Sequence, residues 1–107
     1  MQDSSKKALV NFLASQSFKT VLDVPSGSGW LKKMLPPNNI MDGIDLFEEK
    51  PLGYRNFWKY DLDDGLPEIN ESYDLICCCE GIEHVGNPLL LLRSFYKLLN
   101  VGGQLII

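Results

Sequence analysis

The chain has 107 residues, of which 45% are hydrophobic and 22% are charged, and its formal net charge is −4. These proportions are typical of a folded globular protein and exclude a disordered or fibrous chain. A length of about 100 residues accommodates one hydrophobic core, so we expect a single domain over residues 1–107. The acidic balance provides no general basic face for phosphate backbones, which argues against a nucleic-acid substrate.

Other classes of protein are excluded by features that the sequence lacks. No apolar run approaches the roughly 20 residues of a membrane-spanning helix, and the first residues lack the order of a signal peptide. We therefore expect no membrane contact and a cytoplasmic location. The three cysteines, Cys77, Cys78 and Cys79, are consecutive. This spacing fits neither a disulfide framework nor a CxxC zinc site, so we interpret them as small apolar strand residues.

The first part of the chain alternates between helical and strand-like patterns. Apolar residues at helical spacing predict an opening helix over residues 4–15. A short run rich in β-branched residues predicts a strand over residues 20–24, followed by a glycine-rich turn at 25–29. The helical pattern then resumes at residues 30–35 and ends at the Pro36-Pro37 pair.

The same alternation continues to the last residue. A leucine-rich helical stripe over residues 88–99 follows Asn87, which is a suitable N-cap, and the Gly102-Gly103 pair breaks that helix. Nearly continuous apolar runs are typical of strands covered on both faces. Further strands are expected at residues 40–45, 54–60, 73–79 and 104–107.

Strands that alternate with helices indicate an α/β fold with a doubly wound, mainly parallel sheet and helices on both faces. The segment 46–53 has room for at most a short helix. In such sheets ligands bind outside the carboxyl ends of the strands, beside the first strand. The unusual residues of this chain lie at those ends, which makes that edge the expected site.

The glycine-rich turn at 25–29 is the first candidate binding element. Its glycines allow the backbone to approach a ligand closely, and the following helix directs free N–H groups toward it. A nicotinamide-binding protein would have the pattern G-x-G-x-x-G. The three glycine positions of that pattern are occupied here by Pro25, Gly27 and Trp30.

The turn instead resembles the first motif of class I, Rossmann-like S-adenosylmethionine-dependent methyltransferases, in which an acidic residue precedes G-x-G-x-G. The sequence VLDVPSGSG at 21–29 matches it at all but the first glycine, which is Pro25 here. The segments GIDL at 43–46 and YDL at 60–62 are similar to the ribose-side and adenine-side motifs of small-molecule members. CEGIEHV at 79–85 is similar to the segment that follows the fourth strand.

The resemblance implies S-adenosylmethionine as the cofactor. It implies that Asp45 holds both ribose hydroxyls and that Asp61 accepts a hydrogen bond from the adenine amino group. Pro25 removes a backbone donor but holds the extended geometry that the turn requires. The cofactor-binding residues implied by the resemblance are Asp23, Pro25, Ser26, Gly27, Gly29, Asp45, Leu46, Asp61, Leu62, Cys79 and Glu80.

The family also implies the strand order 3-2-1-4-5, followed in complete members by further strands for which the 107 residues leave no room. We therefore expect a domain that is truncated at its C-terminus and has residues 104–107 as an exposed, apolar edge strand. Such an edge invites pairing. The chain is expected to form a homodimer through this edge, to exchange segments, or to aggregate.

Methyl transfer requires little covalent chemistry from the protein, because a sulfonium methyl group is already activated. The protein has to align a nucleophile and, where needed, remove a proton. His84, the single histidine, is the candidate catalytic base, and a base from beyond Ile107 is an equal alternative. The Pro-Pro-Tyr motif of adenine- and cytosine-N-methylating enzymes is absent, which favours an oxygen or carbon atom of a small molecule as the acceptor.

Three alternatives stay open at this stage. Glu80, Glu83 and His84 resemble the E-x-x-E-H cluster with which ubiquinone-pathway and small-RNA O-methyltransferases hold a divalent metal. We predict no metal, because the same Glu-His pair shapes the loop and caps the next helix in metal-free relatives. The second alternative is a non-catalytic S-adenosylmethionine-binding module that needs a partner chain for its acceptor site. The third is a NAD- or nucleotide-binding Rossmann protein.

Overall fold

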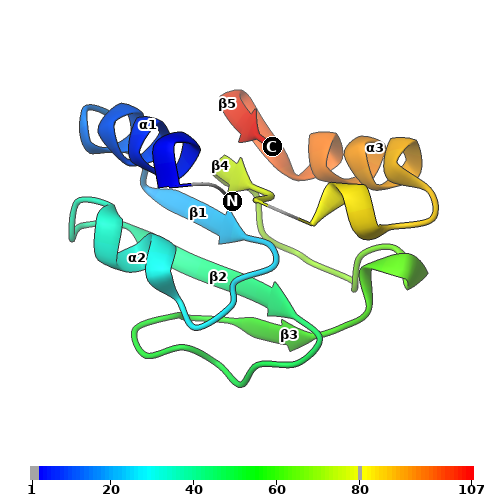
Figure 1. The fold of residues 1–107 in the computed structure, drawn as a ribbon. Helices are drawn as coiled ribbons and strands as arrows, with labels where there is room; N and C mark the ends of the chain where they lie inside the picture. The colour runs from blue at the N-terminus through cyan, green and yellow to red at the C-terminus, as the bar shows by residue number, and fades with distance from the viewer. Residues whose placement is uncertain (1–2, 80) are drawn as a thin grey trace.

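The described residues form a five-stranded parallel sheet with helices on both faces (Figure 1). The structure is a computed structural model that describes residues 3–79 and 81–107. The strand order is β3-β2-β1-β4-β5, which confirms both the α/β class and the predicted order. The strands are β1 (Thr20–Asp23), β2 (Ile40–Asp45), β3 (Phe57–Lys59), β4 (Tyr73–Cys77) and β5 (Leu99–Ile106).

The helical elements cover the two faces unequally. Helices α1 (Asp3–Ala14) and α2 (Trp30–Met34) pack on one face, and α3 (Pro88–Leu98) packs on the other. Two short 3-10 helices, η1 (Leu62–Asp64) and η2 (Ile82–His84), follow the ends of β3 and β4. The segment between β2 and β3 contains no helix, which agrees with the expectation that residues 46–53 have room for at most a short one.

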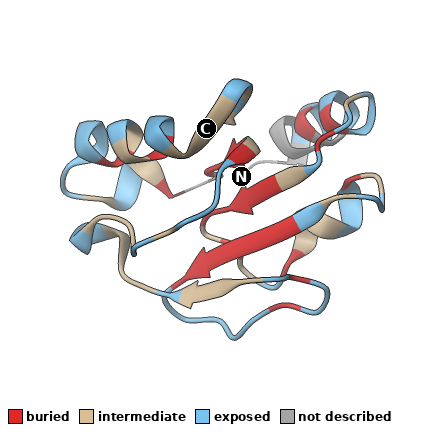
Figure 2. Ribbon diagram, turned by 180° about the vertical axis from the view of Figure 1, so that it is seen from behind, coloured by how far each residue is buried: buried red, intermediate tan, exposed pale blue. Residues whose placement is uncertain are grey.

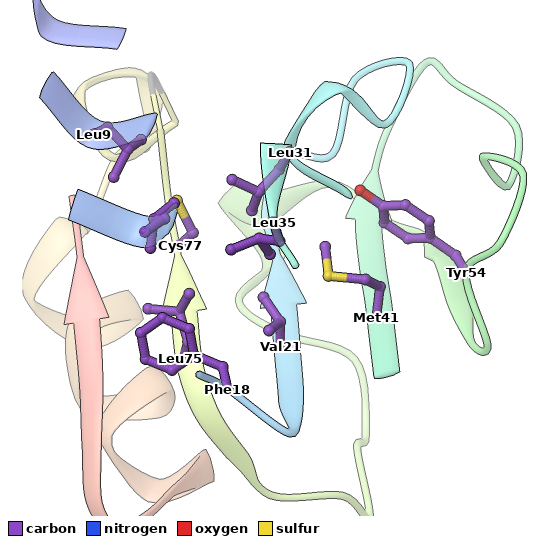
Figure 3. Close-up of a cluster of buried hydrophobic side chains, with 10 residues drawn as sticks. Leu9, Phe18, Val21, Leu31, Leu35, Met41, Tyr54, Leu75 and Cys77 are labelled. Atoms are coloured by element: carbon purple, nitrogen blue, oxygen red, sulfur yellow. The ribbon is translucent and has the colours of Figure 1, made fainter. Parts of the chain in front are cut away.

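Alternating residues of the central strands fill two separate cores. Val21, Leu75 and Cys77 face α1 and α2 (Figure 3), whereas Leu22 and Ile76 face α3. Successive side chains of a strand point to opposite faces, so a strand covered on both sides is mostly apolar, and each buried polar side chain in it needs a partner. Figure 2 shows this burial along β1, β2 and β4, while the outer strands β3 and β5 are only partly buried.

Two predicted strands differ from the observed ones. The strand expected over residues 54–60 is only Phe57–Lys59, because Tyr54 turns into the core and is 3% exposed. β5 begins at Leu99, five residues before the expected start. Tyr73 pairs with Leu99 and Leu75 pairs with Gln104, so residues 100–103 form a bulge in which Gly102 has φ +81°.

Strand β5 lies at one edge of the sheet, as predicted. Within the described residues it pairs with β4 alone, and Val101 and Ile107 are exposed there. Pairing of this edge with a second copy of the chain stays a prediction. None of the helices in the described ranges has the length and apolar content needed to cross a bilayer.

A buried ion pair, which the sequence analysis did not predict, connects β2 to the segment before β3. The Asp42 side chain is fully buried and accepts two hydrogen bonds from Arg55, at 3.0 Å from Nε and 2.7 Å from Nη2. The hydroxyl of Tyr73 and the N–H of Asn56 also donate to this carboxylate, at 2.7 and 2.9 Å. These donors outweigh the effect of burial and lower the pKa of Asp42.

Replacement of Arg55 by Met should therefore destabilise the protein. The expected cost near pH 7 is about 2 kcal/mol, below the 3–5 kcal/mol of a fully buried pair, because the Arg55 side chain is 36% exposed. A lowered carboxyl pKa contributes stability above the unfolded value of 3.8, and this is lost as the pH falls below it. The difference between wild type and Arg55→Met in urea unfolding should shrink there.

Lys59→Met provides the matched control for this experiment. It breaks the Lys59–Glu49 ion pair, whose side chains are 51% and 88% exposed. Its cost should stay below about 0.5 kcal/mol, since exposed pairs contribute little. Equal effects of the two substitutions would contradict the role assigned to the buried pair.

Candidate cofactor site

A cavity of about 280 Å3 opens at the carboxyl ends of β1, β2 and β3, where the sequence predicted a ligand site. Its lining includes Asp45 and Asp61, which are the acidic residues predicted to bind the nucleoside, and His84, which is the candidate base. Among the predicted residues, its lining includes Pro25, Asp45, Leu46, Asp61, Leu62 and His84. The lining residues that sequence reasoning missed are Phe47, Tyr60, Asp63, Gly81 and Val85.

Asp45 is held in a fixed orientation at the end of β2. Its Oδ2 accepts a hydrogen bond from the N–H of Gly27 at 2.9 Å, and its Oδ1 accepts from Phe47 and Glu48 at 2.9 and 3.1 Å. The residue is 7% exposed and still lines the cavity. Since a carboxylate has about four acceptor positions, this group keeps capacity for a ligand hydroxyl.

The turn between β1 and α2 brings backbone close to the cavity. Gly27 and Gly29 have φ +54° and +91°, which side-chain-bearing residues rarely adopt. Pro25 follows a cis peptide bond and lines the cavity. A Cβ on Gly81 would lie 2.7 Å from Cδ of Pro25, so glycine at 81 allows the segment after β4 to pack directly on the turn.

Asp23 and Ser26 lie beneath this turn instead of lining the cavity. Asp23 is 2% exposed, and its Oδ2 accepts a hydrogen bond from the Tyr54 hydroxyl at 2.5 Å. Burial raises the pKa of Asp23 to about 7, the Tyr54 hydrogen bond opposes that rise, and the nearby charge of Asp45 adds to it. The turn therefore rests on a carboxyl group that titrates near neutral pH.

The opposite wall is built by η1 and its connections. Asp61 caps η1, because its Oδ1 accepts from the N–H of Asp63 at 3.0 Å. Asp63 in turn accepts from the N–H of Gly86 at 3.0 Å, which joins η1 to the segment that follows η2. These bonds place Asp61 and His84 around one cavity although 23 residues separate them in sequence.

His84 lines the cavity at its exposed rim. Its side chain is 75% exposed, and its Nε2 lies 3.5 Å from Oε1 of Glu83. Glu80, predicted as a cofactor residue and as a metal candidate, lies outside the described residues. The described part of the chain contains no group of three or more His, Cys, Asp or Glu side chains that could hold a metal ion.

The cysteines do not line the cavity. Cys77 and Cys78 are buried, as expected of small apolar residues in a central strand. Cys79 is partly exposed and packs against the core under α1 and α2, with its Sγ 3.1 Å from that of Cys77. Cys79, which was predicted to bind the cofactor, therefore does not line the cavity and packs on the opposite face of the sheet from Cys78.

The sequence matches the family described as "Methyltransferase domain" over residues 2–107. It is 32% identical to a ubiquinone biosynthesis O-methyltransferase of Pseudomonas savastanoi pv. phaseolicola over 80% of the chain and 42% of the relative. The chain belongs to this methyltransferase family. A ubiquinone biosynthesis O-methyltransferase of Dechloromonas aromatica is 30% identical over 83% of the chain and 43% of the relative. The chain spans less than half the length of these relatives.

Solved structures share the fold of this chain at lower identity. A Bacillus halodurans C-125 protein, provisionally assigned as a methyltransferase, matches with a TM-score of 0.74 and 23% identity over 94% of this chain and 49% of its own. The plantazolicin methyltransferase BpumL, solved in complex with SAH, matches with a TM-score of 0.65 and 23% identity over 90% and 40%. Because the chain belongs to the methyltransferase family, the alternative of a NAD- or nucleotide-binding Rossmann protein is set aside.

The turn geometry predicts a difference between two glycine substitutions. Gly29→Ala should destabilise the chain by about 2 kcal/mol, because it combines backbone strain at positive φ with a Cβ only 2.7 Å from Cβ of Pro51. Gly27→Ala, which meets no atom within 4 Å, should cost only the strain, about 1 kcal/mol. Urea unfolding measures both values. An equal cost would mean that the Pro51 contact does not limit position 29.

Proposed function

We propose that this chain binds S-adenosylmethionine across the carboxyl ends of β1, β2 and β3 and takes part in methyl transfer to an oxygen or carbon atom of a small molecule. The observation that carries the proposal is the Asp45 carboxylate, which three backbone N–H groups orient at the wall of the cavity. The family membership and the naming of the curated relatives as O-methyltransferases support it.

The strand order suggests how the cofactor would lie. Asp61 and Leu62 follow β3 and would take the adenine, with the rings of Phe47 and Tyr60 available for stacking. Asp45 at the end of β2 would take the ribose, with its remaining acceptor position for a hydroxyl. The amino-acid end would then reach the turn after β1 and Gly81 after β4, because these elements form the remaining wall.

His84 is the proposed catalytic base. The cofactor supplies an activated methyl group, so this chain's own residues have to hold the cofactor, align the acceptor and accept its proton. His84 lies on the wall of the cavity nearest Gly81 and Val85, and its ring is accessible to an acceptor. No step of this proposal depends on a metal ion.

The acceptor is proposed only by class. The curated relatives act in ubiquinone biosynthesis by their names, and this chain covers 42–44% of the length of those compared. We therefore assign the cofactor-binding part of the reaction to residues 1–107 as one domain, and an oxygen atom of a small organic molecule as the preferred acceptor.

Titration calorimetry with S-adenosylhomocysteine tests the proposal. The 107-residue chain should bind it, and Asp45→Ala should raise the Kd by about 10-fold to 100-fold through the loss of charge-assisted hydrogen bonds. Glu49→Ala is the control, because Glu49 lies on the same loop, is 88% exposed and does not line the cavity.

Two results would count against the proposal in different ways. Absence of binding by the wild-type chain at millimolar ligand would remove the cofactor assignment. An unchanged Kd in Asp45→Ala would keep the cofactor and move the ribose contact to another residue.

A further inference from the structure

Tyr54 occupies a position directly behind the glycine-rich turn. Its ring is 3% exposed and lies between Gly29 and Gly43. A Cβ would lie 3.4 Å from the ring at Gly29 and 2.9 Å from it at Gly43, so the second of these positions has no room for a side chain. Figure 3 shows the ring beside β2, with its hydroxyl level with the carboxyl end of that strand.

The hydroxyl of Tyr54 donates a hydrogen bond to Oδ2 of Asp23 at 2.5 Å. Among the described residues, the other titratable side chains whose charge acts on Asp23 are Asp45 from β2, Cys77 from β4, and Cys78 and Cys79 just after it. None of these four groups carries a positive charge. A buried carboxylate without a cationic partner is costly, and a hydrogen bond to its charged form reduces that cost.

We propose that Tyr54 is a positioning residue of the cofactor site, which holds a negative charge on Asp23 behind the turn that receives the cationic amino-acid end of the cofactor. This inference rests on the proposed function. S-adenosylmethionine carries a sulfonium and an ammonium group, and a buried charge acts on such groups strongly across a low-dielectric layer without direct contact. The bound cofactor would supply the positive charge that the four neighbouring side chains lack.

The coupling between charge and binding has a definite sign. The pKa of Asp23 is about 7 in the free protein, so its carboxyl is protonated at lower pH and attracts the cofactor less. Binding of the cation should release a proton, and the affinity should fall as the pH drops below about 7. Loss of the Tyr54 hydroxyl removes the hydrogen bond that opposes the rise, and the pKa of Asp23 then rises further.

The test compares Tyr54→Phe with wild type in S-adenosylmethionine binding between about pH 5.5 and about pH 9. The midpoint of the pH dependence should move up by about one unit, which weakens binding about fivefold at pH 7 and leaves it nearly unchanged at the alkaline end. Tyr73→Phe is a matched control, because Tyr73 makes the same kind of buried bond to Asp42, away from the cavity. It should leave the midpoint unchanged.

A neutral ligand separates this inference from the proposed function. Methylthioadenosine is a neutral thioether that keeps the nucleoside but lacks the sulfonium charge and the amino-acid end, so it should bind wild type and Tyr54→Phe equally at every pH. Asp23→Asn should abolish the loss of S-adenosylmethionine affinity below about pH 7. If neither ligand binds the wild-type chain, the proposed function fails. If both ligands bind and Tyr54→Phe keeps the wild-type midpoint, the inference is overturned. It is also overturned if Tyr54→Phe weakens the binding of both ligands at every pH, because Tyr54 then has only a structural role.

Discussion

The site depends on how Asp45 connects two loops that parallel strands bring to the same edge. Its two carboxylate oxygens accept from Gly27 in the turn after β1 and from Phe47 and Glu48 in the loop after β2. Neither loop has regular secondary structure to satisfy these N–H groups. One carboxylate therefore organises the turn and remains at the cavity wall, where a ligand can reach it.

The glycine positions follow from the same arrangement. With the turn bound to Asp45, the chain needs positive φ at Gly27 and Gly29, and Gly81 has to approach Pro25. Proline at the first glycine position of the family motif is compatible with this geometry, because the N–H groups of Ser26, Gly27 and Gly29 donate the hydrogen bonds of the turn. The departure from the motif thus leaves the shape of the turn intact.

Much of this arrangement could be predicted from the sequence. Apolar periodicity located α1, α3 and the three central strands, and the motif order located Asp45, Asp61 and His84 around one site. The strand order came from the family resemblance, since periodicity within each strand contains no information on which strands are neighbours. The early start of β5 was missed because residues 100–103 form a bulge, which the Gly-Gly pair indicated only as a break.

Contacts between residues distant in sequence could not be predicted. Tyr54 reaches Asp23 and Tyr73 reaches Asp42 across 31 residues each, and no local pattern distinguishes these tyrosines from ordinary apolar strand residues. The hydrogen bond from the N–H of Gly86 to Asp63 could not be predicted for the same reason. An acidic residue in the middle of an apolar strand, as at Asp42, was the one available signal that a buried partner had to exist.

An amide-resolved NMR titration with S-adenosylhomocysteine tests the central claim most directly, and the chain of 12.1 kDa is well suited to it. The account predicts saturable shifts of the N–H groups that bind the site carboxylates, namely those of Gly27, Phe47 and Asp63, and little change along α3. An absence of shifts, or shifts gathered on the surface of α3 around Leu90, Arg93 and Lys97, would contradict it.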